Sequence, residues 1–411
     1  MAVVELNDTQ SSAGARAEQV ARASYGRLLA ILAAQTGDIP AAEDALGDAF
    51  ERALGSWPRD GVPTNPAGWL VTVARNRHLD SVKSAAYRLA APLDLDVAVF
   101  DGVDLDAIPD KRLELMFVCA HPAIDAAART PLMLQTVLGF DAAFIARAYA
   151  VPTTAMAQRL VRAKKRIRLA RVPFVVPVVQ DMPARLPFVL EAIYGAYAID
   201  WQLVSGATVR DSLAAEALYL AKTLAVLLDD EPEALGLAAL IAFSLARADA
   251  RVADGCLVPL AEQNRALWRP ELVREGESLL RRAHALGRVG RFQLEAAIQS
   301  AQCAAVRPDH GVMRTLYDAL VLVSPTLGAR VARAAVVAEA DGPRAGLDEL
   351  ESIDGAERFQ PAWATRAHML ALIGETEAAT SAYSKAISLT TDAPSRAYLA
   401  KKMAELRPSD R

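Results

Sequence analysis

Basic and amide side chains gather on one predicted helix, from about residue 153 to residue 171. Arginine and glutamine can each form paired hydrogen bonds to a base edge, and lysine binds phosphate as a point charge. These side chains therefore predict non-covalent binding of nucleic acid. The candidate side chains on this helix are Thr154, Gln158, Arg159, Arg162, Lys164, Lys165, Arg166 and Arg168.

The residues around this helix have the pattern of a helix-turn-helix. Asp141 precedes a short amphipathic stretch and is expected to cap its first turn. Val151-Pro152 ends that stretch, because proline disfavours helix at the residue before it, and Thr153 or Thr154 is expected to cap the basic helix. The inward stripe of the basic helix recurs at spacings of three and four, at Met156, Leu160, Ala163 and Ile167.

Charge is concentrated in this region. Residues 142–180 contain eight Lys or Arg and no Asp or Glu, whereas the whole chain has a net charge of −4. A basic face can also be the solvated side of a purely structural helix. The turn, the caps and the one-sided charge together favour a helix that enters the major groove of DNA.

Three more helices are predicted in the first ninety residues. The first covers about residues 15–34 and ends at Thr36-Gly37-Asp38, and the second begins at Ile39. The second carries an acidic face, which suits a basic partner surface but is also typical of a helix exposed to solvent. Its candidate binding residues are Glu43, Asp44, Asp48 and Phe50.

A loop rich in proline and glycine is predicted over residues 56–70, and Asn65-Pro66 begins the third helix. Aromatic and polar side chains on this loop and helix could hold a single strand by stacking and phosphate contacts. The alternative is an ordinary amphipathic helix with both tryptophans in the core. The candidate residues are Trp57, Asn65, Trp69, Thr72, Asn76 and Arg77.

Length and composition indicate an all-α protein of several domains. A chain of 411 residues exceeds one ordinary core, and valine-rich alternating stretches are nearly absent. Three dispersed cysteines fit a reducing cytoplasm, and neither a signal peptide nor a membrane span is expected. Cys119 and His121 lack further ligands nearby, so neither a metal nor a cofactor is expected, and no motif predicts an enzyme.

The second half of the chain is expected to be helical throughout. A flexible acidic linker at residues 93–110 is expected between the first three helices and the helix-turn-helix, and a proline-rich boundary at residues 172–187 separates the basic helix from the second half. Residues 360–393 have the small-and-aromatic spacing of a tetratricopeptide unit, which needs about 34 residues.

The order of these motifs resembles an extracytoplasmic-function sigma factor of the sigma-70 family. The resemblance rests on AEDALGDAFERAL, WPRDGVPTNPAGWLVTVARNRHLD and MAQRLVRAKKRIR, in that order. DKRLELMFVCAHPAIDAAARTPLMLQTVLGF and RLPFVLEAIYGAYAIDW also resemble the subgroup with a tetratricopeptide-like extension. The resemblance implies region 2 at residues 1–92, a linker at 93–110, region 4 at 111–172 and the extension at 173–411.

The resemblance also implies roles for the candidate residues. The acidic helix would dock on core RNA polymerase, whose β′ and β subunits are the expected partners in a bacterial cytoplasm. The tryptophan-bearing loop and the third helix would open and bind the −10 promoter element. The basic helix would bind the −35 element through Thr154, Gln158, Arg159, Arg162, Lys164, Lys165 and Arg166.

The sequence departs from the subgroup in three places. Ala120 stands where a second cysteine is expected, Phe144 stands where an acidic residue is expected, and IYGAYAIDWQLVSG lacks an Asn-Glu-Gly signature. A protein or small ligand of the extension is a further expected partner. Two other functions stay open: a stand-alone helix-turn-helix regulator and a repeat-based interaction scaffold.

Overall fold

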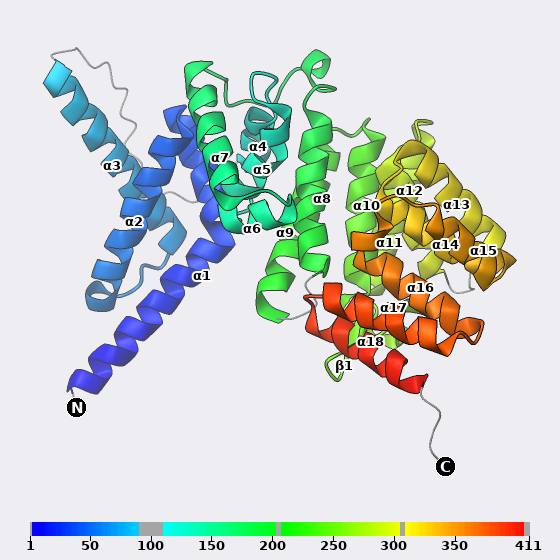
Figure 1. The fold of residues 1–411 in the computed structure, drawn as a ribbon. Helices are drawn as coiled ribbons and strands as arrows, with labels where there is room; N and C mark the ends of the chain where they lie inside the picture. The colour runs from blue at the N-terminus through cyan, green and yellow to red at the C-terminus, as the bar shows by residue number, and fades with distance from the viewer. Residues whose placement is uncertain (1, 90–109, 203–206, 305–308, 407–411) are drawn as a thin grey trace. The chain divides into compact units, whose positions relative to one another are not determined.

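The computed structural model of the chain describes residues 2–89, 110–202, 207–304 and 309–406. Regular structure in these residues is almost entirely helical, which confirms the all-α prediction (Figure 1). The chain forms two compact units, residues 1–195 and 196–411, and each is described by itself. The predicted linker lies outside the described residues except for Asp110.

The first unit begins with three helices that pack on one another: α1 (Ala2–Thr36), α2 (Ile39–Asp60) and α3 (Pro66–Leu89). Gly37 has a φ of 66° and makes the turn after α1 as predicted. The predicted loop is shorter than expected, because α2 continues through Pro58 to Asp60. The continuation keeps Trp57 in the core, where its side chain is 3% exposed.

The rest of the first unit positions the basic helix. Its helices are α4 (Arg112–Cys119), α5 (Ala126–Thr136), α6 (Ala142–Ala148) and α7 (Thr153–Leu169). A 3-10 turn, η2 (Val179–Asp181), and helix α8 (Leu186–Gln202) follow. The division between the two units falls within α8. Helix α4 is buried along most of its length, and α7 packs against α5 and α6. Figure 1 also shows α7 running beside α2.

The second unit is built first around α10 (Pro232–Ala246), which is apolar on nearly all sides and buried. Around it pack α9 (Ala207–Leu227), α11 (Pro270–Ala285) and α12 (Arg291–Cys303). Short 3-10 turns lie between α10 and α11: η3 (Ala248–Ala250), η4 (Leu260–Glu262) and η5 (Arg265–Leu267). A helix that is apolar all round is stable only when neighbours cover every face.

A two-stranded hairpin departs from the helical pattern. Strand β1 (Val252–Ala253) pairs antiparallel with β2 (Cys256–Leu257). The turn uses Asp254 and Gly255 with φ of 50° and 73°, which are the left-handed values that two-residue hairpin turns require. The sequence does not predict these strands, since two-residue strands leave no periodicity to detect.

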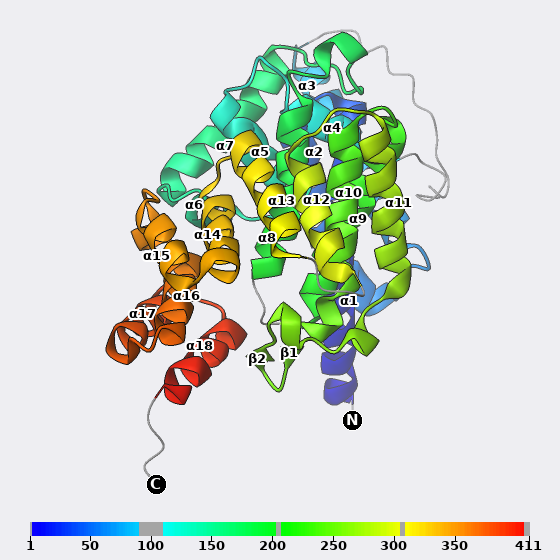
Figure 2. The same cartoon turned by 90° about the vertical axis from the view of Figure 1, so that its right-hand side faces the viewer.

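The remaining helices of the second unit follow one another in space as in sequence: α13 (His310–Val323), α14 (Leu327–Asp341), α15 (Pro343–Glu351), η6 (Ala356–Arg358), α16 (Gln360–Leu372), α17 (Thr376–Leu389) and α18 (Ala393–Glu405). Each α-helix packs on the next, as Figure 2 shows for the descending series from α13 to α18. The last of them, α18, also contacts β2. The arrangement is that of stacked helix pairs.

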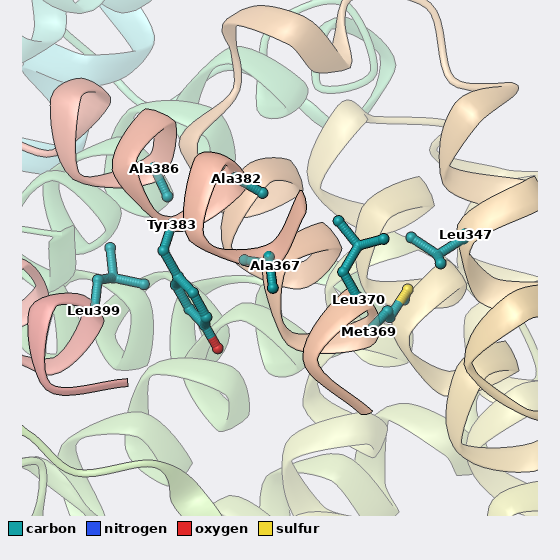
Figure 3. Close-up of a cluster of buried hydrophobic side chains, with 9 residues drawn as sticks. Leu347, Ala367, Met369, Leu370, Ala382, Tyr383, Ala386 and Leu399 are labelled. Carbon is teal, nitrogen blue, oxygen red and sulfur yellow. The ribbon is translucent and has the colours of Figure 1, made fainter. Parts of the chain in front are cut away.

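The helix pair predicted over residues 360–393 is present as α16 and α17. Ala367 and Leu370 of α16 are buried together with Ala379, Tyr383 and Ala386 of α17. Figure 3 shows the Tyr383 ring lying between α17 and Leu399 of α18. Small residues where the helices cross let the two backbones approach, and the tyrosine fills the space beside them.

Candidate nucleic-acid interface

The basic helix α7 follows α6 through a tight turn. Asp141 caps α6 as predicted, because its Oδ1 accepts a hydrogen bond from the Phe144 backbone N–H at 2.6 Å. Ala150 takes the left-handed conformation, with φ of 51°, and the Val151 N–H donates to the Ala146 carbonyl at 3.0 Å. The expected threonine cap on α7 is wrong: Pro152 occupies the cap position and no side chain caps this helix.

Both threonines lie inside α7, whose first helical residue is Thr153. Pro152 sets the backbone for helix entry by its fixed φ, so the helix starts one or two residues earlier than a cap at Thr153 or Thr154 implies. Thr154 is exposed in the first turn of α7, where it faces solvent beside the first-turn backbone N–H groups. Exposed N–H groups at a helix start attract phosphate.

The buried stripe of α7 is the predicted one. Met156, Leu160, Ala163 and Ile167 are at most 5% exposed, so the opposite face of the helix must point outward. The solvent-facing residues on that opposite side define the open face of α7. They are Thr154, Gln158, Val161, Arg162, Lys165 and Leu169.

One flank of α7 is tied to the residues between α4 and α5 and to the start of α5. Arg159 Nη1 donates to the Ala127 carbonyl at 3.4 Å, and Arg166 Nε donates to the Ala123 carbonyl at 3.4 Å. These bonds are long, so they hold the two guanidinium groups weakly. Arg159 and Arg166 therefore border the open face instead of forming its centre.

The other flank of α7 meets α2. Lys164 Nζ donates to Glu43 Oε1 at 2.6 Å and to Oε2 at 2.8 Å, and Arg168 Nη1 lies 3.2 Å from Asp38 Oδ2. The Lys164 side chain is 11% exposed and that of Glu43 is 23% exposed. Two residues expected to bind different partners, DNA and polymerase, are thus joined to each other.

The acidic face of α2 consists of Glu43, Asp44, Asp48 and Glu51. Asp44, Asp48 and Glu51 are exposed, and Phe50 is half-buried on the same helix. Asp48 Oδ2 accepts a hydrogen bond from Arg77 Nε of α3 at 2.8 Å. This bond and the carboxylate charge raise the pKa of Arg77, so the guanidinium stays fully charged.

The candidate residues of α3 and its preceding loop separate by burial. Trp57 is in the core, edge-to-face with half-buried Trp69 at a centroid distance of 5.6 Å, so the Trp57 ring is not accessible to a base in this conformation. Asn65 Oδ1 caps α3 by accepting from Gly68 N–H at 2.9 Å. The Thr72 hydroxyl donates to the Gly68 carbonyl at 2.9 Å.

Asn65 is exposed at the cap of α3, and Asn76 and Arg77 are exposed within the helix. They lie on α3, whereas Trp57 belongs to α2 and supports Trp69 from behind. Burying Trp57 fixes the orientation of Trp69, since an edge-to-face pair holds both rings in place. The surface of α3 that is available to a single DNA strand therefore consists mainly of polar side chains.

Cys119 and His121 are engaged in local structure. Cys119 Sγ lies 3.6 Å from Thr136 Oγ1, and burial raises the pKa of the thiol to about 12. His121 Nδ1 accepts from the Ala123 N–H at 3.1 Å, and burial together with nearby Arg185 lowers its pKa. The thiol therefore stays protonated at neutral pH, and Nδ1 of His121 takes part in the turn between α4 and α5.

Sequence reasoning missed Val161 on the open face of α7 and two residues outside that face, Asp38 and Gly26, which take part in packing the first unit. Val161 is 65% exposed on the open face, and its position outside the buried stripe could have revealed it. Asp38 is both the cap of α2 and a partner of Arg168. Gly26 packs α1 against Val137, and no sequence signal marks such a long-range contact.

Among the helices that the structure describes, none combines the length and apolar character that a membrane span requires.

Residues 20–88 match sigma-70 region 2, and residues 185–284 match a family of unknown function, DUF6596. The uncharacterized protein R00370 of Rhizobium meliloti (strain 1021) is 35% identical over 374 residues, which cover 87% of this chain and 88% of that protein. No solved structure gives a significant match.

The region 2 match covers the second half of α1, all of α2 and nearly all of α3. Helix α2 carries the acidic face, and α3 carries the exposed polar side chains. The factors of that family start transcription as subunits of RNA polymerase and have no reaction of their own to catalyse. This chain and R00370 of Rhizobium meliloti therefore belong to one family, and the sigma-70 region 2 domain at residues 20–88 supports a role as a transcription initiation factor that acts with core RNA polymerase and promoter DNA.

Proposed function

We propose that the chain is an alternative sigma factor of the extracytoplasmic-function type, which directs core RNA polymerase to a restricted set of promoters in the bacterial cytoplasm. The acidic face of α2, with Phe50, docks on the β′ subunit. The exposed side of α3 binds the −10 element, and α6 with α7 forms a helix-turn-helix that binds the −35 element. The domain boundaries follow the plan given by the sequence: 1–92, 93–110, 111–172 and 173–411.

The observation that carries this proposal is the open face of α7. Gln158, Arg162 and Lys165 are exposed on one side of a helix whose other side is fully buried. Because its buried stripe holds α7 in place, the exposed side chains are already positioned for base pairs before DNA binds. Gln158 suits adenine and Arg162 suits guanine, with about 1–3 kcal/mol of discrimination for a good paired contact.

Copurification with core polymerase followed by run-off transcription tests the proposal. Arg162→Ala is expected to lower transcription from dependent promoters about tenfold or more, since one base contact is lost. Arg281→Ala is the matched control, because Arg281 is also exposed on a helix and donates from Nε to the carbonyl four residues back, at 3.3 Å against 3.4 Å for Arg162. Equal promoter use by both variants would contradict the assignment of α7.

We also propose that the C-terminal helices adjust the activity of the factor. Stacked helix pairs offer a continuous surface to a peptide, a protein or a small ligand and seldom catalyse. The test is a truncated chain that ends at Gln202, which keeps α8 whole. Within the first unit, Phe188 of α8 lies under the Arg129 guanidinium at 4.5 Å, so a cut before α8 would damage the part under test. Unchanged polymerase binding and transcription would remove the regulatory role.

Two rival functions give different outcomes in the same assays. A stand-alone regulator would bind a palindromic duplex as a dimer without polymerase, because half-site spacing mirrors protein symmetry. A repeat-based scaffold would bind neither duplex nor polymerase. The match to sigma-70 region 2 favours polymerase binding over both.

A further inference from the structure

The acidic face of α2 is partly covered by α7 of the same chain. Glu43 holds Lys164 through both carboxylate oxygens, and Asp38 holds Arg168 at the start of the same helix. Two ion pairs aligned along two helices are a charge-complementary contact, which favours one register of the helices over others. A surface that accepts one basic helix in this way is suited to accept another.

Close backbone packing between α1 and the end of α5 occurs in the same unit, where α1 also packs on α2 and α5 packs on α7. Gly26 of α1 faces Val137 at the end of α5, and a Cβ added at Gly26 would lie 1.8 Å from the Val137 carbonyl oxygen. Nearby, burial and the Glu43 charge raise the pKa of Tyr25 to about 12. Only glycine at this position allows α1 and α5 to lie so close, and with them α2 and α7.

The contact is suited to being reversible. The Arg168 side chain is 53% exposed and that of Asp38 is 19% exposed, so solvent and salt weaken that pair. Lys164 and Glu43 are more deeply covered, but each is a flexible charged side chain that water can solvate once the helices separate. Exposed Asp44 and Asp48 remain at the edge of the covered surface.

We propose that the acidic face of α2 is a docking surface for a basic helix, for which α7 of the same chain and a basic helical element of core RNA polymerase compete. This inference rests on the proposed function. In the free protein α7 occupies the Glu43 edge of the surface, and polymerase must displace it. Polymerase docking then also frees Lys164 and Arg168 for promoter phosphates.

Competition of this kind has a measurable consequence. If nine of ten free molecules are closed, the apparent Kd for polymerase is about tenfold above that of the open form. Variants that open the contact without changing the polymerase surface should therefore bind polymerase more tightly. Most substitutions on a binding surface weaken binding instead.

Two variants open the contact from different sides, and neither residue belongs to the proposed polymerase or DNA surfaces. Gly26→Ala places a methyl group against the Val137 carbonyl, and Gly14→Ala is its control on the same helix, with nothing within 4 Å of its added Cβ. Asp38→Asn removes the charge that pairs with Arg168 and keeps a good capping residue for α2. Asp38→Asn still tests the contact if Gly26→Ala does not fold.

A water-soluble carbodiimide reports the contact directly, because it joins a carboxylate to an amine only when the two touch. The wild-type full-length chain is expected to give a Glu43–Lys164 crosslink by mass spectrometry, and saturating core polymerase is expected to abolish it. Gly26→Ala and Asp38→Asn should reduce the crosslink and bind core polymerase about three- to tenfold more tightly, whereas Gly14→Ala should match the wild type.

The outcomes separate the two proposals. If wild-type protein does not bind core polymerase, the proposed function fails whatever the crosslink shows. If wild type binds polymerase, this inference alone fails in either of two cases: the crosslink persists in the complex, or both opening variants bind no more tightly than Gly14→Ala.

Discussion

Arg77 donates from Nε to Asp48 Oδ2 across 2.8 Å, so a side chain of α3 is joined to the acidic face of α2. The two residues come from surfaces with different proposed partners, promoter DNA and polymerase. Both side chains are largely in solvent, with 64% and 45% exposed. A pair in this setting orients side chains more than it stabilises the fold.

The first prediction separates stability from binding at this pair. Asp48→Asn and Arg77→Gln should each change the free energy of unfolding by less than about 1 kcal/mol, because exposed ion pairs contribute little. Under the proposed function, Asp48→Asn weakens polymerase binding, and Arg77→Gln weakens open-complex formation with polymerase binding retained. Urea unfolding, polymerase affinity and promoter opening measure the three quantities. A large loss of stability in either variant would show that the pair is structural.

The second prediction concerns Val161, whose apolar side chain stands on the open face of α7 between polar ones. In the major groove the 5-methyl group of thymine is the apolar feature that such a side chain can contact. Burying one methyl group is worth about 0.8 kcal/mol, or about fourfold in affinity. Promoters selected by the wild-type holoenzyme from a randomised −35 library should therefore contain one thymine that cannot be replaced by deoxyuridine without a loss of about fourfold.

Val161→Ser should bind thymine and deoxyuridine at that position equally. Val226→Ser is the control, since Val226 is a 77% exposed valine on α9. If the wild-type protein binds thymine and deoxyuridine equally at every position, Val161 does not contact a thymine methyl group. That outcome would leave −35 recognition by Gln158 and Arg162 untouched.

The third prediction concerns the second unit, where Glu233 of α10 caps α12. Its carboxylate accepts from the backbone N–H of Phe292 at 2.9 Å and of Gln293 at 3.2 Å. Glu233→Ala leaves two buried N–H groups without acceptors and should destabilise the unit by about 1–3 kcal/mol. Exposed Glu277→Ala should change stability by less than about 0.5 kcal/mol. Equal urea midpoints for the two variants would argue against the cap.

The fourth prediction concerns alkaline pH. Burial raises the pKa of the Cys119 thiol to about 12, from 9.0 in the unfolded chain. The unfolded state releases this proton first, so stability is unaffected well below pH 9 and falls as pH rises from about 9 towards about 12. Buried Tyr25 and Tyr317, whose pKa values are raised from 10.0 to about 12, add to the same loss.

Chemical unfolding at pH 7 and pH 10 measures this dependence. Cys119→Ala should be less stable than wild type at pH 7, because a buried group is lost, but its stability should fall less between the two pH values. The same fall in both proteins would show that Cys119 does not contribute. At pH 8 Cys119 should also react with iodoacetamide far more slowly than half-buried Cys256.

Local patterns predicted the features that depend on neighbours in sequence. The Asp141 cap, the turn at Gly37 and the buried stripe of α7 are all present as expected. Each depends on residues within one or two helical turns, so the physical cause is contained in the segment itself. The threonine cap of α7 and the end of α2 were wrong, because proline geometry and the burial of Trp57 outweighed the local signal.

The sequence by itself determined that this protein is almost entirely helical, that a basic helix follows a tight turn, and that the order of its motifs resembles that of sigma-70 factors. Only the tertiary structure decided which cations of that helix are already paired with carboxylates. Lys164 and Glu43 are 121 positions apart, and the close approach of Gly26 to Val137 joins α1 to the end of α5 across a similar distance in sequence. No periodicity within a segment encodes a distance between segments, since that distance is set by how the side chains of several helices fill shared space.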